Sequence, residues 1–249
     1  MILERKYELT SKIGEGSFGY VVKGMNMVTS ALVAVKIEER DSITLRNEAK
    51  IYRLLHNIIG VPSIYNYGVN DTMSYIIMEM LGPPLEPLME NDELLDVCKQ
   101  SLDILQHIHN EHVIHRDIKP ENFLFDKDNR TLYLIDYGLS IYTKGGIDDS
   151  HRSRAGTPIY TSLSVHDGRP HSCGDDMESL GYTLLWLQTG MIPWEKDDED
   201  MIVTKKRYLL CDPENEDELF IYDWVRYCRS ISGDTSYEQL YNIMENQIV

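Results

Sequence analysis

The stretch His115-Arg116-Asp117-Ile118-Lys119-Pro120-Glu121-Asn122 decides how the rest of this sequence is interpreted. Its spacing lets Asp117 accept the proton of an attacking hydroxyl and lets Asn122 bind a magnesium ion. Lys119 can neutralise charge on a phosphoryl group that is being transferred. The alternative is a polar turn without chemistry, but a match over this many positions is improbable by chance.

A second acidic signal, Asp136-Tyr137-Gly138, follows the apolar run Leu132–Ile135. A carboxylate at the end of a strand suits Mg²⁺, a hard cation that prefers oxygen ligands. The ring of Tyr137 is expected to dock against the helix that carries Glu48. Its hydroxyl then needs a hydrogen-bond partner or water.

Near the N-terminus, residues 14–21 read Gly-Glu-Gly-Ser-Phe-Gly-Tyr-Val. Glycines let a backbone approach phosphate oxygens without a side-chain clash. A dinucleotide-binding fingerprint has the same glycine spacing, but it needs a strand before the loop and a helix after it. Here strand-like sequence lies on both sides. A hairpin that covers phosphates is therefore favoured, with a plain glycine hairpin as the alternative.

The next run, Val33-Ala34-Val35-Lys36, ends an apolar strand with a lysine. The stem of that lysine should be buried, and a buried ammonium needs a partner. Glu48, in the following helix, is the expected partner, and Lys36 would reach the α- and β-phosphates of ATP. An edge-strand lysine that points to solvent is the alternative, and the neighbouring motifs make it less favourable.

The composition excludes some classes of function. Of 249 residues, 42% are hydrophobic and 26% are charged, which allows a sizeable core. Only 24 residues are basic against 41 acidic, so the net charge of −17 argues against a nucleic-acid partner. No stretch is expected to cross a membrane, and the N-terminus lacks the apolar core of a signal peptide.

The cysteines show no short paired spacing that would indicate zinc or a redox dithiol. They are Cys98, Cys173, Cys211 and Cys228. This pattern indicates free thiols in a reducing compartment, so a cytoplasmic or nuclear location, or both, is expected.

Two kinds of sequence follow each other along the chain. Strand-like alternation with one helix over 45–55 fills the first third, and amphipathic helices dominate after Leu81-Gly82-Pro83-Pro84. The expected helices include 94–108, a buried helix over 176–188, and a last one opened by Ser236 with Gln239 as a capping box. A lobe boundary near 81–84 is expected, with a cleft between the lobes.

Taken in order, these motifs resemble those of protein kinases over essentially the whole chain, with Tyr137 in place of the phenylalanine of Asp-Phe-Gly. Within them the chain is similar to the casein kinase 1 family. The segments that carry this resemblance are 81–86, 115–124, 175–182 (Asp-Asp-Met-Glu-Ser-Leu-Gly-Tyr) and Ile192-Pro193-Trp194. As in that family, Thr161-Ser162-Leu163-Ser164 stands where other kinases close the activation segment with Ala-Pro-Glu.

The resemblance implies an α+β, bilobal protein-kinase fold as a single domain over 1–249. Its N-lobe (about 1–80) would hold a five-stranded antiparallel sheet and one helix, and a hinge (about 79–84) would lead to a mainly helical C-lobe (about 85–249). The implied reaction is transfer of the ATP γ-phosphate, with Mg²⁺, to Ser/Thr hydroxyls of protein substrates. The implied catalytic residues are Asp117, Lys119, Lys36, Glu48 and Thr157, with Asn122 and Asp136 as metal ligands.

For the nucleotide, the resemblance makes Met78 the gatekeeper and 79–81 the adenine-binding hinge. Ile13, Val21, Ala34, Leu124 and Ile135 would sandwich the purine, and they can equally be core residues. The full expected ATP-binding set is Ile13, Gly14, Glu15, Gly16, Ser17, Phe18, Gly19, Tyr20, Val21, Ala34, Lys36, Met78, Glu79, Leu81, Leu124 and Ile135.

One departure from the family concerns substrate anions. Relatives have basic residues just before Asp175, whereas Cys173-Gly174 stands here. The remaining candidates for an anion site are Arg152, Arg154, Lys205, Lys206 and Arg207. Arg116 could also pair with a phosphate on Ser150 or Ser153, with solvated loop serines as the alternative.

Two other functions remain open at this level. A weak or inactive pseudokinase that acts as a nucleotide-binding scaffold would be marked by loss of Lys36, Asp117 or Asp136, and all three are present. The second function is that of a small-molecule kinase of related fold. Gly156-Thr157 favours protein substrates instead. Protein substrates and a monomer, without nucleic-acid or membrane partners, are expected.

Overall fold

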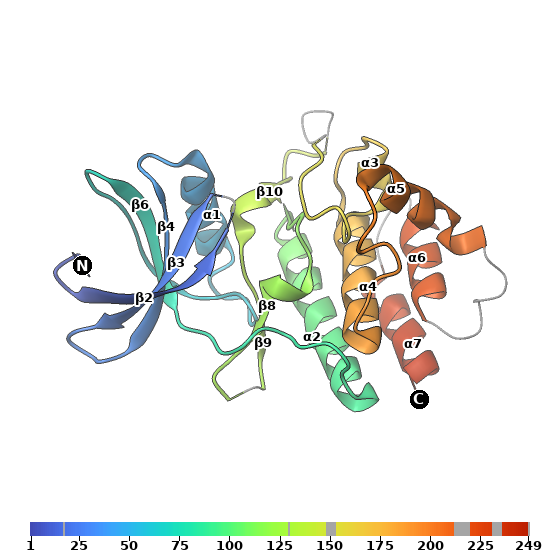
Figure 1. The fold of residues 1–249 in the computed structure, drawn as a ribbon, viewed down its shortest axis with the longest axis horizontal. Helices are drawn as coiled ribbons and strands as arrows, with labels where there is room; N and C mark the ends of the chain where they lie inside the picture. Colours follow the sequence, from blue (N-terminus) through green and yellow to red (C-terminus); the bar gives the residue numbers. More distant parts are fainter. Residues whose placement is uncertain (17, 129, 148–152, 212–219, 231–235, 249) are drawn as a thin grey trace. The chain divides into compact units, whose positions relative to one another are not determined.

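The computed structural model describes residues 1–16, 18–128, 130–147, 153–211, 220–230 and 236–248. The chain divides into two compact units, drawn in Figure 1. The first unit consists of Met1–Pro83 and Phe125–Gly138. The second consists of Pro84–Leu124 and Leu139–Val249.

An antiparallel sheet of six strands, counted over the described residues, dominates the first unit (Figure 1). Its strands lie in the order β1-β2-β3-β4-β6-β5. They are β1 (Ile2–Leu3), β2 (Tyr7–Glu15), β3 (Gly19–Asn26), β4 (Leu32–Glu39), β5 (Ile64–Val69) and β6 (Met73–Glu79). The expected sheet of five strands was therefore one strand short. The additional strand, β1, has only two residues, too few to show an alternating pattern.

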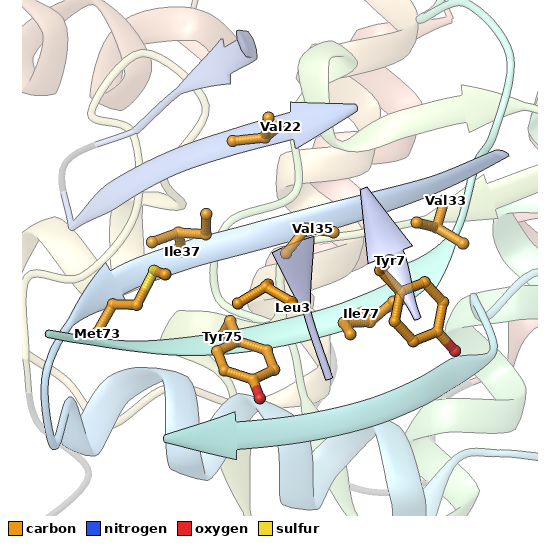
Figure 2. Close-up of a cluster of buried hydrophobic side chains, with 9 residues drawn as sticks. All are labelled: Leu3, Tyr7, Val22, Val33, Val35, Ile37, Met73, Tyr75 and Ile77. Atoms are coloured by element: carbon orange, nitrogen blue, oxygen red, sulfur yellow. The ribbon is translucent and has the colours of Figure 1, made fainter. Parts of the chain in front are cut away.

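Side chains of this sheet form a buried apolar cluster on one face (Figure 2). Val33, Val35 and Ile37 of β4 all belong to it, because every second side chain of a strand points to the same face. Lys36 therefore points to the opposite face. On that side it meets Glu48 of helix α1 (Ile43–Leu54). The α1 helix begins at Ser42, whose side chain accepts a hydrogen bond from the Leu45 N–H.

Helices make up most of the second unit (Figure 1). They are α2 (Asn91–Asn110), α3 (Leu163–His166), α4 (Cys173–Thr189), α5 (Glu199–Tyr208), α6 (Ile221–Ser230) and α7 (Tyr237–Ile248). The α4 helix packs against α2 and α6, and α2 also packs against α7. Most side chains of α4 are buried, as the sequence over 176–188 predicts. At the start of α7, Ser236 accepts a hydrogen bond from the Gln239 N–H, which is one half of the expected capping box. The other half differs, because the Ser236 N–H donates to the hydroxyl of Tyr227 at 2.9 Å.

Short elements complete the chain. The strands β7 (Val113–Ile114) and β10 (Ile141–Tyr142) pair antiparallel within the second unit. Two further short strands are β8 (Phe123–Phe125) and β9 (Leu132–Leu134). Three-residue 3-10 turns occur at Pro120–Asn122, Tyr137–Leu139 and Leu209–Cys211. Over the described part of the chain, no helix combines the length and the apolar character needed to cross a bilayer.

Candidate active site

Lys36 is the centre of a charged cluster in the first unit. Its Nζ donates hydrogen bonds to Glu48 Oε2 and to Asp136 Oδ1, both at 2.7 Å. Glu48 is the partner that the sequence suggested. The Lys36 side chain is 16% exposed and that of Glu48 is fully buried, whereas 45% of the Asp136 side chain is exposed. The cluster thus joins a buried carboxylate to an accessible one through a single ammonium group.

Burial and charge act against each other in this cluster. Burial disfavours the charge of Lys36, but the attraction of Glu48 and Asp136 is stronger and raises the lysine pKa above its ordinary value. Burial raises the pKa of Glu48 to about 7, and the nearby ammonium of Lys36 opposes this rise. With Nζ only 2.7 Å from each carboxylate, the ammonium stays charged at neutral pH.

The backbone around Asp136 is shaped to hold its carboxylate beside Lys36. Asp136 adopts a positive φ of 65°, a conformation in which Asp and Asn are enriched among non-glycine residues. Its N–H donates to the hydroxyl of Tyr52 on α1 at 3.2 Å. Tyr137 packs edge-on against the Tyr52 ring, with 5.0 Å between centroids. The expected docking of Tyr137 on the helix that carries Glu48 is confirmed.

The glycine-rich loop is the turn between β2 and β3. The Gly16 N–H donates to the Gly19 carbonyl at 2.8 Å, which closes the hairpin. A Cβ on Gly19 would lie 2.0 Å from the Ile37 carbonyl, so that position admits only glycine. A Cβ on Gly14 or Gly16 would meet no described atom closer than 3.7 Å, so these two positions are not crowded. Ser17 lies outside the described residues.

Strand register gathers several of the expected nucleotide residues on one face of the sheet. Val21 lies opposite Lys36 across β3 and β4, and Ala34 lies opposite Met78 across β4 and β6. Ala34 and Lys36 are two positions apart on one strand, so all four side chains share the face that is turned away from the apolar cluster.

The other expected nucleotide residues are more scattered. Large exposed side chains occur at Ile13 (46%), Phe18 (54%) and Tyr20 (40%). Glu15 forms an ion pair with Lys12 at 2.8 Å. Glu79 accepts a hydrogen bond from the Ser63 N–H, and Leu81 is partly buried. Ile135 belongs to the first unit and Leu124 to the second.

In the second unit, Asp117, Lys119 and Thr157 form a compact polar cluster. The N–H and the hydroxyl of Thr157 donate to Asp117 Oδ1 at 2.9 and 2.8 Å. Lys119 Nζ lies 2.8 Å from Asp117 Oδ2 and donates to Thr157 Oγ1 at 3.0 Å. Residues that are 38 and 40 positions apart in the sequence therefore orient one carboxylate.

Asn122 joins this cluster from the following turn. Its Nδ2 donates to the Asp117 backbone carbonyl at 2.7 Å and to Asp117 Oδ2 at 3.3 Å. These bonds use the amide nitrogen and turn Oδ1 away from Asp117. The remaining oxygen is therefore the atom that Asn122 can offer to a cation.

Asp176 supports the backbone of the 115–117 segment, a role that the sequence reasoning did not assign. Its Oδ2 accepts from the His115 N–H at 2.7 Å and from His109 Nε2 at 2.9 Å. Its Oδ1 accepts from the Arg116 N–H at 2.8 Å. The sequence predicts a buried helix that begins with Asp176, and a buried carboxylate needs donors. Which donors these are depends on how α4 packs against α2 and against the 115–116 segment.

Among the residues that the structure describes, the expected anion-site side chains do not form one open basic patch. Arg154 pairs with Glu199 at 3.5 Å, Lys205 with Asp197 at 2.5 Å, and Arg207 with Asp167 at 2.7 Å. Lys206 is fully buried, which contradicts its assignment to an anion site. Arg152 and Ser150 lie outside the described residues, and Ser153 accepts a hydrogen bond from Arg116 Nη1 at 3.0 Å.

Comparison with known proteins adds a family-level finding. The family model described as protein kinase domain matches residues 7–223. The chain is 34% identical over 208 residues to casein kinase I homolog 3 of Schizosaccharomyces pombe, which covers 76% of this chain and 47% of that protein. Identity to casein kinase I homolog 2 of the same yeast is 36% over 208 residues, with 76% and 48% covered. For casein kinase I homolog 1 it is 30% over 266 residues, with 92% and 58% covered. The chain thus spans about half the length of these relatives.

Proposed function

Because the chain belongs to the protein kinase family, we propose that it is a casein kinase 1-like enzyme that transfers the ATP γ-phosphate to Ser and Thr hydroxyls of proteins. One observation carries the proposal. Asp117 holds a carboxylate oriented by Thr157 and neighboured by the Lys119 ammonium, which suits a base for a hydroxyl and a cation for a phosphoryl group. We take residues 1–249 as one kinase domain.

In the second unit, each residue of this cluster has a separate role. Asp117 accepts the proton of the substrate hydroxyl as that oxygen attacks phosphorus. Lys119 offsets negative charge on the phosphoryl oxygens. Thr157 binds both side chains and limits their rotation, so that the base is oriented before the substrate arrives. A threonine at this position favours Ser and Thr over Tyr as the acceptor.

In the first unit, the proposed role is to bind the nucleotide. The turn at Gly14–Gly19 would lie over the phosphates, where its glycines leave room for oxygen atoms. Lys36 would contact the α- and β-phosphates while Glu48 fixes its ammonium. Val21, Ala34 and Met78 would lie along the purine, together with the other residues that the sequence analysis assigns to adenine.

Members of the family use ATP with a divalent metal, and the residues present fit Mg²⁺. Asp136 offers a partly exposed carboxylate and Asn122 an amide oxygen, which are hard donors suited to this ion. Over the described residues, no group of three or more His, Cys, Asp or Glu could hold a metal by itself. Mg²⁺ is commonly bound by one or two carboxylates together with substrate phosphates. When bound, Mg²⁺ neutralises phosphate charge.

The proposed partners are protein substrates, with the chain acting as a monomer. A net charge of −17 disfavours nucleic acid. Cys98, Cys173 and Cys228 are free thiols, which suits a reducing compartment such as the cytoplasm or the nucleus.

The test is transfer of labelled γ-phosphate from Mg-ATP to Ser peptides by the wild type and by Asp136→Asn. Asparagine tolerates the positive φ at this position and can still accept from Lys36, so the variant should fold. We expect transfer by the wild type and none above background by the variant. Absence of transfer by the wild type to any peptide, despite ATP binding, would contradict the proposal and favour a scaffold.

A further inference from the structure

Lys206 is a buried lysine in the last turn of α5, and the proposed chemistry does not use it. Its side chain is fully buried. Nζ donates to the Pro158 carbonyl at 2.8 Å and to the Thr161 carbonyl at 2.6 Å. The same nitrogen lies 4.8 Å from the ring centroid of Tyr182 and 5.5 Å from that of Trp194. These contacts suit an ammonium, which has three N–H donors and is attracted to aromatic faces.

A buried ammonium is costly unless its contacts repay the loss of water. Burial lowers the pKa of Lys206 to about 7, and the charge of Arg229 acts in the same direction while Glu178 opposes it. Methionine would fill the same space without that cost. The two hydrogen bonds to backbone carbonyls are what the amine of Lys206 supplies and a methionine could not.

Both carbonyls belong to the turn Thr157–Thr161. Thr157, at its start, donates twice to Asp117 Oδ1. Within the turn, the N–H groups of Tyr160 and Thr161 donate to the Thr157 carbonyl at 2.9 and 3.0 Å. Trp194 Nε1 donates to the Ile159 carbonyl at 2.8 Å. Lys206 binds the carbonyls of Pro158 and Thr161, so it connects the first half of the turn with its last residue.

We propose that Lys206 is a positioning residue for phosphoryl transfer, which holds the turn Thr157–Thr161 so that Thr157 stays bonded to Asp117. The inference rests on the proposed kinase function. Lys206 does not contact the Asp117 carboxylate; it acts through the turn. Its removal should loosen the turn and disorient the base without changing the nucleotide-binding residues of the first unit.

The first experiment needs neither nucleotide nor peptide. Amide hydrogen exchange is measured at Thr157, Tyr160 and Thr161 in the wild type, in Lys206→Met and in Lys99→Met. Lys99 is a matched control, since its Nζ also lies over a tyrosine ring, 5.1 Å from the centroid of Tyr241. We expect faster exchange at the three amides in Lys206→Met only. Unchanged exchange in that variant would overturn the proposal, whether or not the chain is an active kinase.

The second experiment is steady-state kinetics on the same variants and on Lys206→Arg. In Lys206→Met, kcat/KM for a Ser peptide should fall about 10- to 100-fold while KM for ATP stays unchanged. Lys206→Arg keeps a charged donor and should recover part of the loss. Equal kcat/KM in wild type and Lys206→Met would overturn the proposal. So would a Lys206→Met protein that is unfolded at the assay temperature, because Lys206 would then serve stability alone.

The wild type could show no phosphoryl transfer while Lys206→Met still shows faster amide exchange than the wild type. That result would contradict the kinase function but support the role of Lys206 in holding the turn.

Discussion

At the scale of single residues, buried charges explain much of the local geometry. Asp176 is buried, yet its two oxygens accept three hydrogen bonds, two of them from the backbone of His115 and Arg116. Burial alone would raise the pKa of Asp176, but the hydrogen bonds and the charge of His109 bring that pKa below its ordinary value. A charged carboxylate is thus kept inside the protein, and it fixes the backbone next to Asp117.

Gly181 illustrates a residue whose role is to have no side chain. A Cβ there would lie 2.4 Å from Cδ1 and 2.6 Å from Nε1 of Trp224, whose indole N–H donates to the Met177 carbonyl. We expect Gly181→Ala to lower the free energy of unfolding by about 1–3 kcal/mol through overpacking, measured as a lower Tm or urea midpoint.

The matched control for this change is Gly174→Ala on the same helix. The nearest atoms to a Cβ at Gly174 lie at 3.6 and 3.7 Å, an ordinary contact distance. Helix propensity favours alanine over glycine, so it predicts stabilisation at both sites. A drop in Tm for Gly181→Ala alone isolates the contact with Trp224. Equal shifts in both variants would show that this contact is not what requires glycine.

Sequence spacing predicted some residues of the candidate site and misjudged others for a physical reason. Asp117, Lys119 and Asn122 are close in sequence, so their proximity follows from one short turn. Lys205-Lys206-Arg207 was interpreted as one basic element. In α5, however, consecutive side chains point about 100° apart, and they cannot share a face. One of the three is consequently buried, and a sequence window gives no signal for that.

At the scale of elements, the length of a helix or strand decided whether the sequence could predict it. Helices α2, α4 and α7 and the longer strands carry enough residues to show their period. Residues 195–200 form an acidic cluster, and a cluster of this kind is typical of a solvated loop. In the structure Asp198 caps α5, and Glu199 and Asp200 form its first turn. Acidic residues are stabilising at a helix start, so that cluster was also compatible with a helix N-terminus.

Three helices meet at His109, and this junction makes stability depend on pH. His109 of α2 contacts Asp176 of α4 at 2.9 Å and the hydroxyl of Tyr237 of α7 at 2.6 Å. Burial opposes the charge of the imidazole, but hydrogen bonds with Asp176 and Cys173 outweigh it and raise the pKa of His109 from 6.5 to about 9. Between these values the folded protein holds a proton that the unfolded chain releases. The stabilisation is complete below pH 6.5 and is lost as the pH rises through 9.

We therefore expect the free energy of unfolding of the wild type to fall by roughly 2–3 kcal/mol more than that of His109→Gln between pH 6.5 and 9.5. Glutamine keeps a polar side chain but does not titrate. The measurement is urea unfolding at several pH values for both proteins. Parallel pH dependence in the two would show that His109 is not the group responsible.

At the scale of the whole molecule, the balance of charge can be counted from the sequence, but the way that the charges pair cannot. Arg154 meets Glu199 across 45 positions of sequence, and Arg207 meets Asp167 across 40. No local pattern links such pairs. They place a carboxylate beside Arg154 and another beside Arg207, while the molecule as a whole keeps a net charge of −17. A strongly negative molecule repels acidic substrates and attracts basic ones.

The negative net charge predicts a preference for basic substrates. Two peptides with the same acceptor serine, one flanked by arginines and one by glutamates, are compared at low and moderate NaCl concentration. We expect the basic peptide to have the higher kcat/KM at low salt. The ratio of kcat/KM for the basic peptide to kcat/KM for the acidic peptide should shrink several-fold between about 20 and 200 mM salt, because screening shortens the range of the electrostatic field. A peptide with an upstream phosphoserine should resemble the acidic one.

Preference for the acidic or phosphorylated peptide at low salt would mean that Arg154, Lys205 and Arg207 exchange their carboxylate partners for substrate anions. An anion site would then operate despite Cys173-Gly174.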